Sequence, residues 1–165
     1  MSAERSSMIL PAFFTRIVDQ GGEFPSGEWP EHITLFAPAK GHYSEEVCTG
    51  LRHLARTASP FTVVTSGRAL FGPDRTIPVR LIKPSETILG LQQRIADVFA
   101  SLEHDPTYMH PYRPHISAHR RDGKLVLPPA GASFEVGGFA VVQRLGAHAA
   151  WRVVDKIRLK GEVDT

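Results

Sequence analysis

EHITLF (residues 31–36) and RPHISA (residues 113–118) each place a histidine two positions before a hydroxyl residue, among apolar neighbours. Side chains alternate between the two faces of a β-strand, so His32 and Thr34 would share one face while Ile33 points to the other. His115 and Ser117 would share a face for the same reason. Each segment therefore predicts a strand that is buried on one side and carries a His-x-Ser/Thr pair on the other.

The same spacing occurs a third time, at His42 and Ser44, but its context is different. A helical pattern follows it, with Ser44 suited to the N-cap and with Glu45 and Glu46 suited to the positive end of a helix. The other two copies lie in strand-like sequence, 83 residues apart. Strand context therefore separates His32 and His115 from the copy at His42.

Composition indicates a soluble globular protein, since the 165 residues are 42% hydrophobic and 22% charged. We expect one domain over residues 1–165 and a monomeric protein. No membrane segment is expected, because no apolar run approaches the roughly 20 residues of a membrane span. The single cysteine, Cys48, cannot form an internal disulfide and has no paired base nearby in sequence, which favours a cytoplasmic location. A net charge of +2 favours a small or local anionic ligand over general coating of nucleic acid.

The order of elements predicts an α+β protein. Helices are expected over residues 44–57 and 85–102, the second with apolar residues at three- and four-residue steps. Short strands are expected at residues 8–18, 61–67, 68–72, 76–83, 133–145 and 149–161, with a Gly/Pro-rich loop at residues 19–30. Helix followed by strands occurs twice, so we expect two similar antiparallel-sheet lobes, with helices outside and a central cleft between them.

These residues resemble the two-histidine (2H) phosphoesterases, in particular their LigT-like, or 2′-5′ RNA ligase-like, branch. The likeness rests on HITL (32–35), on HISA (115–118) with its Pro114 lead-in, on PFTVVTSGRALFG (60–72) and on the closing WRVVDKIRL (151–159). It extends over about residues 8–160. Two features depart from the family pattern: a short loop stands where a helix commonly precedes the first motif, and Ala118 replaces a larger apolar residue.

The resemblance implies a bilobal fold whose motifs face each other across a concave sheet. It also implies activity on cyclic phosphates or 2′-5′ linkages of nucleotides or RNA, usually without metal or other cofactor. His32 and His115 would supply the base and the acid, because imidazole titrates near pH 6.5 and one ring can be neutral while the other is protonated. Thr34 and Ser117 would donate hydrogen bonds to phosphate oxygens. Which histidine is the base stays open.

Weaker candidates surround the motifs. Phe36, Phe71 and Tyr112 could stack on a nucleotide base, although such aromatics are also common in cores. Arg75 and Arg113 could bind phosphate or lie in solvent, and His119 could point into the cleft or to the surface. His110, His115 and His119 match no standard zinc spacing and have no Cys or carboxylate beside them, so no metal site is expected.

The expected function is therefore a metal-independent phosphodiesterase acting on a 2′,3′-cyclic phosphate or on a 2′-5′-linked or cyclic nucleotide or RNA. Reversible 2′-5′ RNA ligation and degradation of cyclic oligonucleotide or ADP-ribose-derived signals are alternatives with the same chemistry. A non-catalytic nucleotide- or RNA-binding module is a third alternative. Intact His and hydroxyl residues in both motifs favour catalysis over binding alone.

Overall fold

Strands make up most of the molecule. The computed structural model describes residues 7–25, 28–106, 111–146 and 149–162, and within them ten strands form one sheet in the order β10-β5-β6-β7-β3-β1-β11-β12-β2, with β4 paired to β1. All these pairings are antiparallel. The sheet strands are β1 (Ser7–Phe14), β2 (Glu23–Phe24), β3 (His32–Thr34), β4 (Ala39–Lys40), β5 (Phe61–Phe71), β6 (Ile77–Ile82), β7 (His115–Ser117), β10 (Ser133–Val136), β11 (Gly138–Leu145) and β12 (Trp151–Arg158). A separate hairpin joins β8 (His119–Arg121) to β9 (Lys124–Val126).

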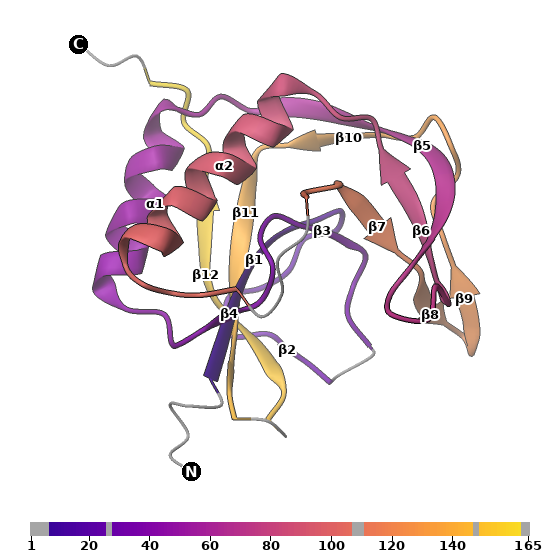
Figure 1. Cartoon of the computed structure of the whole chain (residues 1–165), viewed down its shortest axis with the longest axis horizontal. Helices are drawn as coiled ribbons and strands as arrows, with labels where there is room; N and C mark the ends of the chain where they lie inside the picture. Colours follow the sequence, from indigo (N-terminus) through magenta and orange to yellow (C-terminus); the bar gives the residue numbers. More distant parts are fainter. Residues whose placement is uncertain (1–6, 26–27, 107–110, 147–148, 163–165) are drawn as a thin grey trace.

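Two helices, α1 (Glu45–Thr57) and α2 (Glu86–Ser101), lie side by side over one face of the sheet (Figure 1). Both begin at the serine that the sequence predicts, because the Ser44 and Ser85 hydroxyls accept hydrogen bonds from backbone N–H groups three residues later, each at 3.3 Å. The helices approach closely at Gly50, where a Cβ would lie 2.7 Å from Val98 Cγ1. None of the described helices is both long and apolar enough to cross a membrane.

The sheet has a core on each face. The larger core contains the apolar sides of both helices and the central residues of the two motifs, Ile33 and Ile116, both fully buried. A smaller core on the opposite face includes Phe14 and Trp151, with Phe24 and Trp29 packed against it. The helices therefore bury one face of the motif strands and leave the other face for the polar residues.

The expected bilobal α+β arrangement is confirmed. One half of the sheet holds β10, β5, β6 and β7, and the other holds β3, β1, β11, β12 and β2. The two halves meet where β3 pairs with β7, so each half contributes one motif to the junction.

The observed strands differ from the predicted ones in several details. Residues 61–72 were expected to hold two strands, but residues 61–71 form the single strand β5, which carries a bulge between Thr65 and Arg68. Residues 133–145, expected as one strand, divide at Gly137, since β10 pairs with β5 and β11 pairs with β1 in the other half. The first strand ends at Phe14 rather than at residue 18, and the β8–β9 hairpin was not predicted. The short strand β2, which pairs with β12, lies inside the loop expected at residues 19–30, and β4 was not predicted.

Candidate active site

The two motifs lie on adjacent strands. Ile33 of β3 pairs with Ile116 of β7 in antiparallel register, which sets His32 opposite Ser117 and Thr34 opposite His115. Because side chains alternate along a strand, these four residues occupy the face turned away from the helices. Directly opposite Cβ atoms in such a pair are about 5 Å apart and diagonal ones, such as those of the two histidines, about 7–8 Å. The structure therefore brings the four motif residues together.

Both histidines are held by the same backbone contact. His32 Nδ1 lies 2.9 Å from the carbonyl oxygen of Pro30, and His115 Nδ1 lies 2.7 Å from that of Arg113. A carbonyl oxygen can only accept, so in each ring Nδ1 carries the hydrogen and donates it. Nε2 of each neutral ring is then an acceptor that can take a proton from a reactant and return it.

Burial lowers the pKa of both imidazoles. For His32, burial is the main cause and the charges of His115 and His119 add to it, while the hydrogen bond to Pro30 opposes it. For His115, burial is again the main cause and the Arg113 guanidinium adds to it, while the hydrogen bond to the Arg113 carbonyl opposes it. The lowered pKa values favour the neutral form of both rings at neutral pH in the free protein. The ordinary imidazole pKa would allow one ring to be neutral and the other protonated with little adjustment, and burial shifts both rings toward the neutral form.

Aromatic rings pack around His32. The ring centroids of Trp29 and Phe14 lie 4.9 Å and 5.5 Å from that of His32. Trp29 also contacts the edge of Trp151 at 5.2 Å and the Phe24 ring at 5.8 Å. No local pattern in the sequence predicts this role for Trp29, because a Gly/Pro-rich segment indicates only a loop. Trp29 therefore packs against the His32 ring on the side of the smaller core.

His115 has different neighbours, two of which were candidates from the sequence. The edge of the Phe71 ring faces His115 with 4.6 Å between ring centroids. The Arg113 guanidinium lies 4.9 Å from the centroid of the same Phe71 ring. Arg75 lies in the turn between β5 and β6, exposed and with φ of 52°, and its backbone N–H donates to the Gly72 carbonyl. Phe71 and Arg113 are therefore at the site, and Arg75 is on a turn that follows Phe71.

Tyr112 and Phe36 take structural positions. The Tyr112 hydroxyl donates to the backbone carbonyl of Thr34 at 2.9 Å, and burial raises its pKa. Phe36 stacks on Phe99 of α2 at 5.0 Å with an interplanar angle of 7°, on the helix side of the sheet. Tyr112 thus fixes the strand that carries Thr34, whereas Phe36 is not brought to the face of the histidines.

His119 lies near His32 rather than at the surface. Its Nδ1 is 4.0 Å from Glu31 Oε2, and each of these two side chains is 16% exposed. The Thr15 hydroxyl donates to the other Glu31 oxygen at 2.9 Å. In the described part of the chain, no group of three or more His, Cys, Asp or Glu residues is placed to hold a metal ion. His110, named above with His115 and His119, lies outside the described residues.

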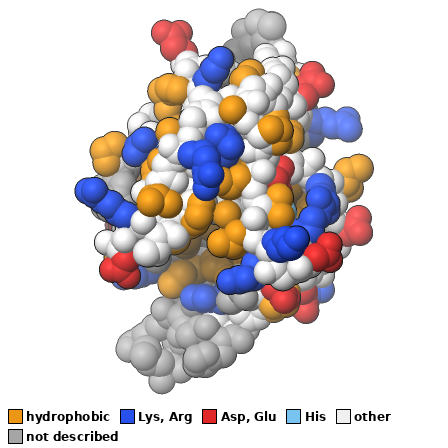
Figure 2. Space-filling model, turned by 90° about the vertical axis from the view of Figure 1, so that its right-hand side faces the viewer, with side chains coloured by type: hydrophobic (Ala, Val, Ile, Leu, Met, Phe, Trp, Pro, Cys, Tyr) orange, Lys and Arg blue, Asp and Glu red, His pale blue; other side chains and the backbone are white. Residues whose placement is uncertain are grey.

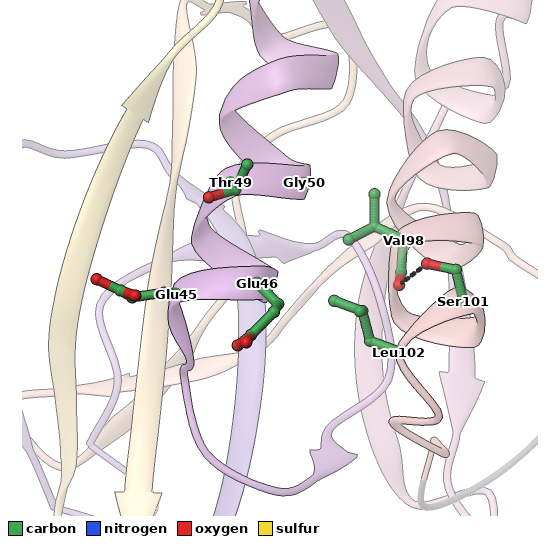
Figure 3. A pocket seen from close by; sticks show the side chains of 7 residues that line it. All are labelled: Glu45, Glu46, Thr49, Gly50, Val98, Ser101 and Leu102. Atoms are coloured by element: carbon green, nitrogen blue, oxygen red, sulfur yellow. Dashed lines mark hydrogen bonds between the residues drawn. The ribbon is translucent and has the colours of Figure 1, made fainter.

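The helix side of the molecule carries a separate hollow of about 470 Å³ between α1 and α2 (Figure 3). Its lining includes Glu45 and Glu46 and no cation. By contrast, positively charged side chains lie across the middle of the face over β5, β6, β8 and β9 (Figure 2). On the hairpin itself, Arg120, Arg121 and Lys124 are exposed. An anionic ligand is therefore favoured on the sheet side and disfavoured between the helices.

A match to a known protein family agrees with the family relationship that the motif geometry indicates. The model of the 2′-5′ RNA ligase superfamily matches residues 11–153, which include both motifs. The chain belongs to the 2′-5′ RNA ligase superfamily. Its members are LigT-like 2H phosphoesterases, with phosphoesterase- or ligase-type activity on RNA or nucleotides.

Solved structures with the superfamily fold cover nearly the whole chain. TT0787 of Thermus thermophilus is 23% identical with a TM-score of 0.65, over 94% of this chain and 100% of that protein. E. coli LigT complexed with 3′-AMP is 13% identical with a TM-score of 0.58, over 94% of this chain and 98% of that protein. E. coli LigT has also been crystallised with NADP+ and with ATP. No curated protein sequence matches this chain.

Proposed function

We propose that this protein is a metal-independent phosphodiesterase that hydrolyses a 2′,3′-cyclic phosphate, or a related 2′-5′-linked or cyclic nucleotide, with His32 and His115 as general base and acid. The observation that carries the proposal is the β3–β7 register, which sets each histidine opposite the hydroxyl residue of the other motif. A phosphate placed on this face would meet two imidazoles and two hydroxyls together.

Hydrolysis needs two proton transfers. One histidine takes a proton from water through Nε2 while the water oxygen forms a bond to phosphorus. The bond from phosphorus to one ribose oxygen breaks, and the other histidine, protonated at Nε2, gives its proton to that oxygen. The sum is one water added, with a phosphate monoester and a free ribose hydroxyl as product.

The remaining negative charge falls on the two non-bridging phosphate oxygens. Thr34 and Ser117 stand on the same face as the histidines and can donate hydrogen bonds to these oxygens. Because these residues supply both proton transfers and charge stabilisation, the scheme needs no metal ion.

The lowered pKa values give the substrate a part in protonating the acid. Both free imidazoles are suited to act as base at neutral pH, since burial lowers the pKa of each. The acid must gain a proton before the leaving oxygen departs. The bound phosphate anion favours this protonation, because a negative charge beside an imidazole raises the pKa of the imidazole.

The test is hydrolysis of 2′,3′-cyclic mononucleotides and of oligoribonucleotides ending in a cyclic phosphate, in excess EDTA. We expect the wild-type protein to be active and His32→Ala and His115→Ala each to lose about 10²- to 10⁴-fold. His53→Ala is the matched control, since His53 is exposed on α1. Circular dichroism would verify that each variant is folded. Activity that survives either motif substitution, or that EDTA abolishes in the wild type, would contradict the proposal.

Ligation is the second candidate, and the superfamily match favours it. The same two proton transfers join a cyclic phosphate end to a second strand when a 5′-hydroxyl replaces water as the nucleophile. The 5′-oxygen forms a bond to phosphorus, the bond from phosphorus to one oxygen of the cyclic phosphate's ribose breaks, and that oxygen takes the proton from the acid. Incubation of the two RNA ends at high concentration, followed by denaturing gel electrophoresis, would separate a joined strand from a hydrolysed end.

A further inference from the structure

We propose that a groove at the ends of β1, β11 and β12 binds the phosphate that precedes the reacting end of an RNA strand, so that the site acts on strand ends in preference to mononucleotides. The inference rests on the proposed function. It adds a second anion-binding position that lies outside the two motifs.

The groove adjoins the motif site. It has a volume of about 470 Å³, and Phe14 and Thr15 at the end of β1 form part of its wall. Phe14 pairs with His32 across β1 and β3, and their ring centroids are 5.5 Å apart. The Thr15 backbone N–H donates to the carbonyl of Glu31, the residue before His32, at 3.1 Å. One wall is therefore shared between the groove and the first motif.

Unpaired cations line the groove. Arg16, Lys156 and Arg158 belong to its lining, and Glu135 is the acidic residue there. All three cationic residues are exposed, and none of their side chains makes an ion pair or hydrogen bond with another described residue. Their charge is therefore available to an anion from solution, which is what phosphate binding requires.

The register directs two of these cations to the face of the motifs. Lys156 pairs with Ala140, and Arg158 pairs with Gly138. The neighbouring Asp155 faces the helices instead, since its carboxylate accepts a hydrogen bond from Arg52 of α1. Since alternate residues of β12 face opposite sides, Lys156 and Arg158 face away from the helices, as His32 does. Successive rows on this face run from β3 through β1 and β11 to β12.

The distance between the groove and the motifs is larger than a single phosphate. Three strand spacings of about 4.8 Å separate β3 from β12, or about 14 Å between their backbones. Long Lys and Arg side chains shorten that gap. Ile17, 91% exposed, gives the groove an apolar rim for a base or ribose. Gly138 lets β11 lie close against β12 at the groove, because any Cβ there would collide with the Ile157 carbonyl.

Two substrates that differ in the presence of a second phosphate test the groove. A 2′,3′-cyclic mononucleotide with a free 5′-hydroxyl has no second phosphate, whereas a dinucleotide with the same cyclic end has one. The wild-type KM for the dinucleotide should be about tenfold lower. The double variant Lys156→Gln/Arg158→Gln should raise the KM for the dinucleotide about tenfold more than that for the mononucleotide. The slope of log affinity against log salt concentration should also become shallower, by about 0.7 for each phosphate-binding cation removed.

Arg152→Gln is the matched control, because Arg152 is an exposed cation at the other end of β12. It should leave both KM values unchanged. Equal KM values for the two substrates in the wild type, or an equal rise for both in the double variant, would overturn the inference.

A binding measurement separates this inference from the proposed function. Fluorescence anisotropy with a labelled oligoribonucleotide ending in a 3′-phosphate needs no turnover. If the wild type hydrolyses neither substrate, the proposed function fails, and weaker binding by the double variant but not by Arg152→Gln still supports the groove. Unchanged binding in the double variant, with the fold intact by circular dichroism, overturns it.

Discussion

Ile33 and Ile116 are paired directly across β3 and β7, and both are fully buried on the helix side of the sheet. This pairing places both motif histidines on the opposite face. A slip of one residue in either strand would turn its histidine toward the helices. The apolar core therefore fixes the chemistry of the other face.

The hydroxyl residues should contribute to turnover more than to the fold. We expect Thr34→Val and Ser117→Ala each to lower kcat by about 10²- to 10³-fold, since each removes one donor to the charged phosphate oxygens. Steady-state kinetics with a cyclic-phosphate substrate measures this loss. Thr34→Ser keeps the donor and should retain most of the activity. A Thr34→Val protein as active as the wild type would remove Thr34 from the mechanism.

Stability should fall as the pH drops below about 6.5, where histidines of the unfolded chain bind protons. Burial holds the folded pKa values of His32 and His115 below that value, so over this window the unfolded state binds more protons and is favoured. Urea unfolding at about pH 5 and about pH 7.5, on either side of the ordinary histidine pKa, would measure the effect. The double variant His32→Asn/His115→Asn should show a smaller pH dependence than the wild type. An identical dependence in both proteins would contradict the lowered pKa values.

Trp29 should control the pKa of His32. Trp29→Ala removes the ring that lies 4.9 Å from the imidazole, so water reaches His32 and its pKa should rise toward the ordinary value. NMR titration of the imidazole signals measures the change. His115, whose ring contacts Phe71 instead, serves as an internal control in the same titration. A His32 pKa that stays unchanged in this variant would show that Trp29 is not responsible for its burial.

Asp155 should contribute to the stability of the fold and not to catalysis. Its carboxylate, 6% exposed, accepts hydrogen bonds of 2.6 Å from both the Tyr43 hydroxyl and the Arg52 guanidinium, joining β12 to α1 and the segment before it. Asp155→Ala should lower the free energy of unfolding by about 2–3 kcal/mol, because two hydrogen bonds to a charged carboxylate are lost, one from the half-buried Tyr43 hydroxyl and one from the exposed Arg52 guanidinium. Glu162→Gln, in an exposed ion pair with Arg56, should change it by less than about 1 kcal/mol. Similar losses in the two variants would contradict this difference.

Local signals in the sequence were enough to predict both helices and both motif strands. Ser44 and Ser85 cap the helices as expected, because a cap depends on residues three positions away. The alternation in HITL and HISA likewise predicts which side chains are buried, and Ile33 and Ile116 confirm it.

Long-range contacts account for what was missed. The chain changes partners at Gly137, from β5 to β1, and no local pattern specifies where a strand crosses between halves of a sheet. Trp29 stands in a Gly/Pro-rich segment, and its packing against Trp151 depends on a strand more than a hundred residues away. Phe36 was a candidate for base stacking, but α2 provides the ring on which it stacks.

The central claim is that His32 and His115 act as one acid and base pair. A double-mutant cycle tests it most directly, with kcat/KM measured for the wild type, His32→Ala, His115→Ala and the double variant on one cyclic-phosphate substrate. Residues that act as a unit are strongly non-additive, so the double variant should be about as slow as the slower single variant. Losses that multiply, with each single variant keeping substantial activity, would show that the two histidines act independently and would contradict the account.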